Sequence, residues 1–481
     1  MKSIVILGGG IAGFSIARSL EKKLVEPGKA KVTLVDQRAH MVYQPFLAEV
    51  ASGSIDPRHV EVPYHQHLQK TEVVCARVMG LSAAKQEVYL RNMDGDDWTL
   101  PYDECVVALG AVTKTFPTPG IADYAIGLKS VEEAVHIRNK VIMNLNRASS
   151  MYKDNPNRQR LLTFIVVGGG FSGVEGFSEI LSLAHTMVRY YPSIDESELS
   201  FHLIEASDRI MPELPRERSQ WVIQALEQRG GHVHLGTFVT SAEDGVVKTP
   251  EGDEFPTEVI VWTAGSLANP VLKQSDLPLD KRGRLMCRTD LRVEGPDGIV
   301  PHVWGVGDVA CVEDKSGGGL PDGSCAPTAQ HAARQAKVLV DNLVATCKAD
   351  ELTDYYHANA GMVAGLGVGL GVFTDGSKEH GVNGMLAWLA HRGYHGLAMP
   401  TVERKFRILS DWVRGLVLGP DVASTSEFSN ARGFFEEYAL RPKPAEPQEE
   451  KKEEPVAEAA SEPESAESEP APAPTPAAVV A

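Results

Sequence analysis

The chain has 481 residues, of which 43% are hydrophobic and 23% charged, so it is long and apolar enough for two or three globular domains. Its formal net charge of −17 argues against nucleic acid as the main partner. The longest apolar run, residues 363–373, is shorter than the roughly 18 residues of a membrane-spanning helix and is broken by glycines, so we expect a strand there. The six cysteines show no zinc-ligand spacing, and we predict no metal site.

The N-terminal stretch, residues 4–36, predicts a strand, a glycine turn, a helix and a second strand. The turn "GGGIAG" contains the GxGxxG pattern, and Asp36 ends the second strand. Such glycines allow the tight turn, the approach of a diphosphate to the backbone and close helix packing, while the acid binds a ribose hydroxyl. We therefore predict dinucleotide binding by the turn residues Gly8, Gly9, Gly10, Ala12 and Gly13, together with Asp36.

Residues 163–205 repeat this plan about 160 positions later. The turn "GGGFSG" supplies Gly168, Gly170 and Gly173, and Glu205 is the terminal acid. An acid at this position favours the unphosphorylated ribose of NADH over that of NADPH. Arg209, four residues further on, leaves two alternatives open: it weakens this preference, or it is a solvated loop charge.

Two intact turns imply two dinucleotides, and one of them must carry electrons between substrates. Flavin and nicotinamide are the common pair. The strand "HVWGVGD" ends in Asp308, which follows a glycine turn and could hold a ribityl hydroxyl of FAD. Since this strand belongs to the first fold, we expect FAD at the first turn and NADH at the second.

The predicted fold class is α/β, with two Rossmann-like dinucleotide-binding folds and a C-terminal membrane-associating α/β segment. From Arg441 to Ala481 there are ten Glu against four Lys and Arg, in a Pro- and Ala-rich context that cannot bury a core. We expect an FAD-binding domain, an NAD-binding domain, a C-terminal region and a disordered acidic tail, over residues 1–112 with 290–348, 113–289, 349–440 and 441–481 respectively.

Residues 402–418 predict an amphipathic helix with net charge +2. Its apolar face is Val402, Phe406, Leu409, Val413, Leu416 and Val417, and its polar face is Arg404, Arg407, Asp411 and Arg414. A second helical candidate near 384–391 precedes it, with Leu386, Trp388, Leu389, Arg392 and Tyr394 as an interfacial mixture. We expect residues 384–418 to bind a membrane surface; the alternative is an ordinary amphipathic helix packed on the protein.

Several segments together resemble the type II NADH dehydrogenases, the single-subunit NADH:quinone oxidoreductases. The resemblance covers residues 1 to about 435 and rests on "DQRAHMVYQPFLAEVASGSIDP", "YDECVVALGAVT", "VIVWTAG", "WGVGDVA" and "PTAQHAARQ". It implies noncovalent FAD, NADH as donor, a membrane quinone as acceptor and a peripheral location at the cytoplasmic face of the cell membrane. Members of this family often form dimers.

The same resemblance implies roles for further residues. Ala108, Gly110 and the backbone of Val78 would contact FAD, and Gly265 would contact NADH. Glu175 matches an acid near the nicotinamide, and Ala329 with Gln330 matches the flavin's quinone edge. We expect Glu175 and Gln330 to serve the pocket that handles the protons of quinone reduction. The alternatives are a helix N-terminal acid for Glu175 and helix-end packing for Gln330.

The chain departs from the family at the acceptor side, because Arg334 stands where many members have a second Gln and Gln335 follows it. Two other classes therefore stay open. One is a related flavoprotein with another acceptor, such as sulfide or a soluble electron carrier; neither glycine turn carries the cysteine that a sulfide enzyme needs. The other is an interaction protein that senses redox state by binding FAD and NADH.

Overall fold

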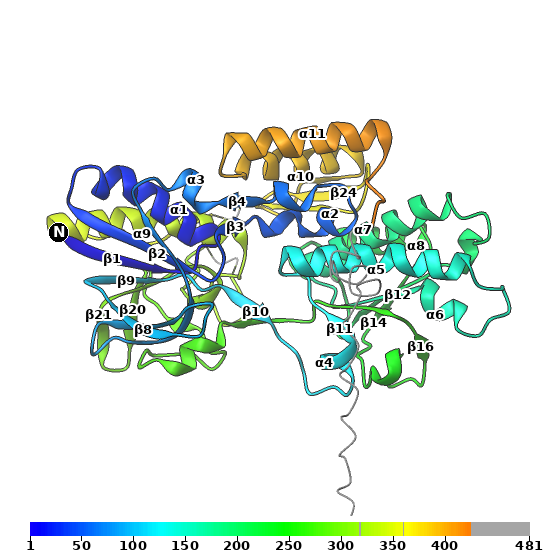
Figure 1. Ribbon diagram of the computed structural model, residues 1–481, viewed down its shortest axis with the longest axis horizontal. Helices are drawn as coiled ribbons and strands as arrows, with labels where there is room; N and C mark the ends of the chain where they lie inside the picture. The colour runs from blue at the N-terminus through cyan, green and yellow to red at the C-terminus, as the bar shows by residue number, and fades with distance from the viewer. Residues whose placement is uncertain (317–318, 359, 425–481) are drawn as a thin grey trace, which may run out of the picture. The chain divides into compact units, whose positions relative to one another are not determined.

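The computed structural model describes residues 1–316, 319–358 and 360–424. The acidic tail predicted for 441–481, and residues 425–440 of the predicted C-terminal region, lie outside the described residues. Within them, two parallel sheets follow the two glycine turns, and a small sheet with two helices comes last (Figure 1).

The first sheet has the strand order β20-β21-β9-β1-β2-β5. β1 (Lys2–Leu7) lies between β2 (Ala30–Asp36) and β9 (Glu104–Val107), parallel to both. The edge strands are β5 (Glu72–Cys75) and the antiparallel β20 (Arg292–Gly295), and β21 (Gly298–Gly305) lies between β20 and β9. Thus strands from both ends of the chain complete one fold, and α1 (Ile11–Leu20) packs against α9 (Ala329–Lys348).

The second sheet is parallel throughout, in the order β11-β17-β12-β13-β14. Its central strand, β12 (Thr163–Val167), is buried at every position, as expected for a strand covered on both faces. The other strands are β11 (Ala125–Ile126), β17 (Val259–Trp262), β13 (Ser200–Glu205) and β14 (Gly231–Leu235). Its helices are α5 (Val131–Ser149), α7 (Phe171–Val188) and α8 (Arg216–Glu227).

Short elements fill the connections. A three-stranded antiparallel sheet consists of β6 (Arg77–Ser82), β7 (Glu87–Arg91) and β8 (Asp97–Pro101). Two-stranded pairs are β3 (His40–Val42) with β4 (Glu61–Pro63), β10 (Ala111–Thr113) with β18 (Ser266–Ala268), β15 (Val246–Lys248) with β16 (Glu254–Pro256), and β19 (Leu285–Met286) with β22 (Ala310–Cys311). The short helices are α2 (Leu47–Ala51), α3 (Tyr64–His67), α4 (Ile121–Tyr124) and α6 (Arg158–Leu162).

The C-terminal part begins with the apolar run that the sequence predicts as one strand. That prediction is wrong: the run forms a hairpin of β23 (Met362–Gly365) and β24 (Gly371–Thr374). Gly367 and Gly369 have positive φ and supply the turn. After β25 (Gly381–Asn383) come α10 (Met385–Ala398) and α11 (Val402–Leu418). Across the described residues, no helix is both long and apolar enough to cross a membrane.

Candidate functional site

The first glycine turn joins β1 to α1 and is closed by contacts that exclude larger side chains. Gly8 has a φ of +94°, and a Cβ there would lie 2.4 Å from the carbonyl oxygen of Ala108. A Cβ on Gly13 would lie 1.9 Å from the carbonyl oxygen of Gly8, whereas one on Gly10 would meet no described atom within 4 Å. The space beside Gly10 leaves the N-terminus of α1 open, where backbone N–H groups and the helix dipole favour a diphosphate.

Asp36 is fixed to this turn by hydrogen bonds. Its Oδ2 accepts the Gly9 N–H at 2.6 Å and its Oδ1 accepts the Arg38 N–H at 2.8 Å. Burial raises the pKa of this carboxyl, although the two N–H donors and the Arg38 charge oppose the rise. The carboxylate thus lies at the edge of the turn where dinucleotide folds recognise a ribose hydroxyl.

The second turn joins β12 to α7 and repeats this geometry. Gly168 has a φ of +112°, and a Cβ on Gly173 would lie 1.9 Å from the Gly168 carbonyl oxygen. Glu205 Oε2 accepts the Gly169 N–H at 2.5 Å, and Oε1 accepts the Ser207 N–H at 2.7 Å. In both turns, therefore, the predicted acid accepts the N–H of the second of three consecutive glycines, Gly9 or Gly169.

Asp308 comes close to the first turn although it lies almost 300 residues away in sequence. It follows Gly307 (φ +76°), whose N–H donates to Gln335 Oε1 at 2.8 Å. A Cβ built on Gly307 would lie 4.0 Å from the Cβ of Ala12, in the first turn of α1. Burial raises the pKa of Asp308, while the charge of Lys129 opposes the rise. The predicted partners of one ligand are thus brought together from both ends of the chain.

Two further predicted residues flank the β10–β18 pair. Gly110 (φ +65°) directly precedes β10, and Gly265 (φ +105°) directly precedes β18. The carbonyl of Gly110 accepts the Asn269 N–H and that of Gly265 accepts the Lys114 N–H, each at 3.2 Å. Since the strands are antiparallel, the two glycines lie at opposite ends of this ribbon.

Ala108 and Val78 lie beside the first sheet. Ala108 follows β9, is buried and donates its N–H to the carbonyl of Leu7 at 2.8 Å, next to the first glycine turn. Val78 is half-buried in β6, whose start is held near Asp36 because the Ala76 N–H donates to the Asp36 carbonyl at 2.9 Å. Both predicted residues are therefore near the turn and its acid.

Glu175, five residues after Gly170 on α7, reaches out of its own domain. Its Oε1 accepts the N–H of Gly365 at 3.0 Å and lies 3.4 Å from His391 Nε2. Burial alone would lower the pKa of His391, but the carboxylates of Glu175, Glu49 and Glu179 raise it above its usual value. The carboxylate is therefore held by the C-terminal segment rather than capping its own helix.

Gln330 lies in the first turn of α9, directly after Ala329, the first residue of the helix. Its Nε2 donates to the carbonyl of Gly361 at 3.2 Å, and its Oε1 accepts from Arg334 at 3.0 Å. Glu175 thus bonds the last residue of β23 and Gln330 the residue just before the strand, and these are four residues or about 13 Å apart along the chain. β23 spans the space between the two candidate catalytic side chains.

Known proteins are similar to this chain in sequence and in fold. The family model of the pyridine nucleotide-disulphide oxidoreductases matches residues 2–336. A type II NADH:quinone oxidoreductase from Haemophilus influenzae is 30% identical over 416 residues, covering 81% of this chain and 92% of the relative. The type II NADH:quinone oxidoreductase Ndh of Mycobacterium tuberculosis is 28% identical over 424 residues, covering 85% and 87%.

The chain belongs to the type II NADH:quinone oxidoreductases, within the pyridine nucleotide-disulphide oxidoreductase family. The solved structure of NDH2 from Plasmodium falciparum in complex with NADH has the same fold. It superposes with a TM-score of 0.79 at 18% sequence identity, covering 88% of this chain and 99% of that one.

The departure from the family at Arg334 has a structural explanation. Arg334 donates to Gln330 Oε1, so its charge is bound to the predicted acceptor-side glutamine. Gln335, one position later, is buried and instead accepts the N–H of Gly307 beside Asp308. The glutamine that follows in this chain is therefore bonded to the turn before Asp308.

Sequence reasoning missed the side chains that hold the turns from a distance. The Tyr64 hydroxyl donates to the Gly9 carbonyl at 2.9 Å, and Thr263 donates to the carbonyls of Val167 and Gly168. His391, in contact with Glu175, was missed as well. An aromatic, a threonine and a histidine carry no local pattern that marks such contacts.

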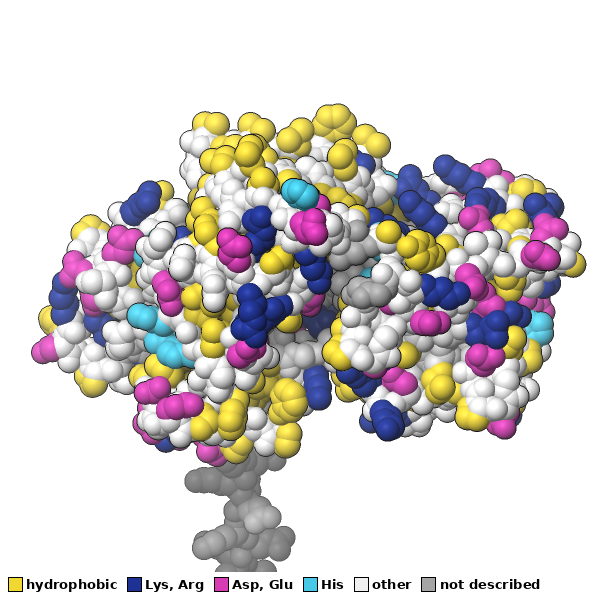
Figure 2. Space-filling model, turned by 180° about the vertical axis from the view of Figure 1, so that it is seen from behind, with side chains coloured by type: hydrophobic (Ala, Val, Ile, Leu, Met, Phe, Trp, Pro, Cys, Tyr) yellow, Lys and Arg dark blue, Asp and Glu magenta, His cyan; other side chains and the backbone are white. Residues whose placement is uncertain are grey.

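The exposed apolar face of α10 and α11 agrees in part with the predicted surface. All six apolar residues predicted for α11 are exposed, with Leu409 at 51% and Val417 at 76% (Figure 2). The sequence predicts Trp388 and Arg392 in the membrane-binding mixture and Asp411 on the polar face of the helix. All three are buried, so these predictions are wrong. The Arg392 guanidinium stacks 4.1 Å from the Trp388 ring centroid, and Asp411 accepts from the Asp56 N–H and contacts His59 Nδ1 at 2.6 Å.

Proposed function

We propose that the chain transfers a hydride from NADH to FAD bound at the first glycine turn and passes the electrons to a membrane quinone. FAD, when bound, supplies the redox chemistry that converts a hydride into electrons for the quinone. The observation that supports this most strongly is the pair of equivalent turns, each with its acid in place. The turn of Gly307 and Asp308 comes to the first of them, which supports placing the flavin there.

In this proposal residues 1–112 and 290–348 form the FAD-binding domain, and residues 113–289 form the NAD-binding domain. Gly10 and the start of α1 receive the diphosphate, Asp36 a ribose hydroxyl and Asp308 a ribityl hydroxyl. Ala108, Gly110, Ala329 and the backbone of Val78 line the same ligand. The residues present fit it, because the space beside Gly10 is open and the buried Asp308 carboxyl is brought to the same turn.

The second turn receives NADH for each turnover. Gly170 is open in the same way as Gly10, and Glu205 is placed to bind an unphosphorylated ribose. Gly265, between β17 and β18, contacts the same ligand. The chain orients the nicotinamide, and orientation is the main contribution of protein to such a transfer.

Quinone reduction requires two protons, and we assign their handling to Glu175 and Gln330. Glu175 contacts His391, whose raised pKa favours the protonated ring, so the histidine can hold a proton beside the Glu175 carboxylate. Gln330 supplies an amide fixed by Gly361 and Arg334. The two side chains meet the acceptor from opposite ends of β23.

The acceptor is reached from a membrane surface bound by residues 384–418, at the cytoplasmic face. α10 and α11 expose a face of leucine, valine and phenylalanine side chains, while four basic against two acidic residues in α11 suit anionic headgroups. The dimer expected from the family stays a prediction.

The membrane assignment is tested with Leu409→Asp combined with Val413→Asp. Both side chains are exposed, so folding should be unchanged while binding to anionic liposomes in a sedimentation assay is lost. The matched control is Tyr152→Asp with Phe238→Asp, which charges exposed aromatic positions elsewhere. Liposome binding that survives in the first variant would show that α11 is an ordinary surface helix.

The reaction is tested by anaerobic stopped-flow spectroscopy on the purified flavin-loaded chain. NADH should bleach the flavin, and a soluble menaquinone or ubiquinone analogue should restore its absorbance rapidly. Bleaching without faster recovery by any quinone would contradict the proposal and favour another acceptor or a sensing role.

A further inference from the structure

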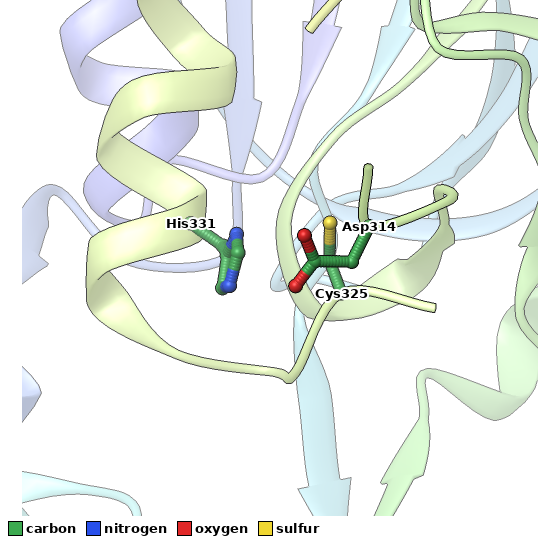
Figure 3. A group of neighbouring side chains, drawn as sticks. All are labelled: Asp314, Cys325 and His331. Carbon is green, nitrogen blue, oxygen red and sulfur yellow. The ribbon is translucent and has the colours of Figure 1, made fainter. Parts of the chain in front are cut away.

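Three side chains with metal-binding chemistry come together beside the first turn of α9. Asp314 and Cys325 lie on the segment between β22 and α9, and His331 lies on α9 (Figure 3). One ligand atom from each of the three residues lies within 4.8 Å of the other two. The spacing of these residues, 11 and 6 positions, matches no zinc motif, so only the fold brings them together.

Hydrogen bonds from neighbouring residues fix the side chains of His331 and Asp314. His331 Nδ1 is 2.8 Å from the Tyr355 hydroxyl, which leaves Nε2 to coordinate an ion. Metal-bound histidines are commonly fixed in this way through the other ring nitrogen. Asp314 Oδ1 accepts both the N–H and the hydroxyl of Ser316, which fixes the carboxylate and leaves Oδ2 for the ion.

One neighbouring cation is Arg334 on α9, whose guanidinium donates to Gln330 Oε1. Cys325 is buried, and burial raises the pKa of its thiol to about 12. Because a metal binds the thiolate, uptake of an ion here releases a proton from Cys325.

We propose that Asp314, Cys325 and His331 form a binding site for a divalent ion of the zinc type, with the fourth position open to water. Thiolate, imidazole and carboxylate together suit Zn²⁺, whereas Mg²⁺ and Ca²⁺ prefer oxygen ligands. In a tetrahedral site these ligand atoms are about 3.3–3.8 Å apart. The ligand atoms lie within 4.8 Å of one another, so side-chain rotation can bring them to these separations.

The ion ties the segment after β22 to the first turn of α9. His331 directly follows Gln330, and Thr328 caps the helix by accepting the His331 N–H at 3.3 Å. A bound ion therefore fixes the helix end that presents Gln330. This inference does not depend on which acceptor the enzyme uses, because its readout is the metal itself.

The test uses the full flavin-loaded chain, dialysed against Zn²⁺ and then buffer, followed by metal analysis and zinc X-ray absorption spectroscopy. We expect one Zn²⁺ per chain, with one sulfur at about 2.3 Å and nitrogen or oxygen ligands at about 2.0–2.2 Å. Cys325→Ser should lose the sulfur shell, and Tyr355→Phe should bind 10–100-fold more weakly.

The matched control is Cys75→Ser, which removes an exposed thiol far from the site in sequence and should leave stoichiometry and spectrum unchanged. Three results would each overturn the proposal: no retained Zn²⁺ in the unaltered chain, a sulfur shell that persists in Cys325→Ser, or a sulfur shell that is lost in Cys75→Ser. Circular dichroism of each variant excludes unfolding as the cause of any loss.

Discussion

The two glycine turns of this enzyme share their main contacts, but one pair of equivalent residues on the helices that follow them has different partners. Ser15 on α1 and Glu175 on α7 occupy equivalent places in the two patterns. The Ser15 hydroxyl donates to the Ile11 carbonyl of its own helix at 2.6 Å, whereas Glu175 reaches Gly365 and His391 in the C-terminal segment. The two turns thus share the geometry expected of a dinucleotide site, while the equivalent residues on the following helices make different contacts.

The two turns also differ in what surrounds them. The Gly9 carbonyl accepts from the side chain of Tyr64, while the Gly169 carbonyl accepts from the backbone of Met211, only six residues after Glu205. The first turn is further supported by the buried Gln335 through Gly307. The second turn is supported in its own way by the Thr263 hydroxyl, which donates to the Gly168 carbonyl at 3.2 Å, so distant residues hold both turns through different contacts.

The largest expected effect comes from substituting the last glycine of each GxGxxG pattern, Gly13 or Gly173. Gly13→Val and Gly173→Val each place a side chain against a backbone carbonyl, because the Cβ would lie 1.9 Å from it. We expect a loss of about 3 kcal/mol in the free energy of unfolding for both. The first variant should purify without flavin, and the second should keep flavin that NADH cannot reduce. Gly415→Val, at an open position of α11, is the control, and equal flavin loss in both variants would remove the distinction.

The next effect concerns the position at which the helices differ. Glu175→Gln removes the carboxylate that contacts His391, so quinone reduction should slow by about 10²–10⁴-fold. Reduction of the flavin by NADH should keep its rate in the same stopped-flow experiment. Ser15→Ala, at the equivalent place on α1, should change neither step. A normal quinone rate in Glu175→Gln would return Glu175 to a structural role.

A smaller effect is expected when the acid of either turn, Glu205 or Asp36, is replaced by its amide. Glu205→Gln weakens a charge-assisted hydrogen bond worth about 1.5–3 kcal/mol, so kcat/KM for NADH should fall about 10–100-fold. Asp36→Asn should instead raise the Kd for flavin and leave the NADH dependence of the loaded enzyme unaltered. The assignment of Glu205 is incorrect if the unaltered enzyme uses NADPH better than NADH.

The smallest expected effect is on the pH dependence of stability. It arises at His391, which contacts Glu175, whereas Ser15 at the equivalent place on α1 bonds a carbonyl of its own helix. The pKa of His391 is raised in the folded protein, so its stabilising contacts are fully present below the pKa of an unfolded histidine, about 6.5. They are lost as pH rises through the folded pKa, by at most about 1.4 kcal/mol per pH unit. Thermal unfolding from pH 6 upward should therefore show a shallower decline in His391→Gln. The exposed His380→Gln serves as control, and identical slopes in all three proteins would exclude a charged His391.

Local pattern predicts the turns well, because strand, glycines, helix and acid lie within about 40 residues of each other. The helix at 402–418 is likewise predicted by its apolar periodicity, with bounds that match α11. The same periodicity misplaces Asp411, because the partner that buries it, His59, lies more than 350 residues earlier. Tyr64, Gln335 and His391 depend on similar long-range contacts. The metal-type cluster at Cys325 was missed for the same reason, since its ligands share no motif.

The most direct measurement compares Gly10→Ala with Gly170→Ala. Both glycines have ordinary negative φ values, and a Cβ at either meets no described atom within 4 Å, so both variants should fold normally. The added methyl group should obstruct only the diphosphate that approaches each turn. Gly10→Ala is predicted to raise the Kd for FAD with the KM for NADH unchanged in the reconstituted enzyme, and Gly170→Ala to raise the KM for NADH with full flavin content. The reverse pattern, or loss of flavin in both variants, would contradict the assignment of the two turns.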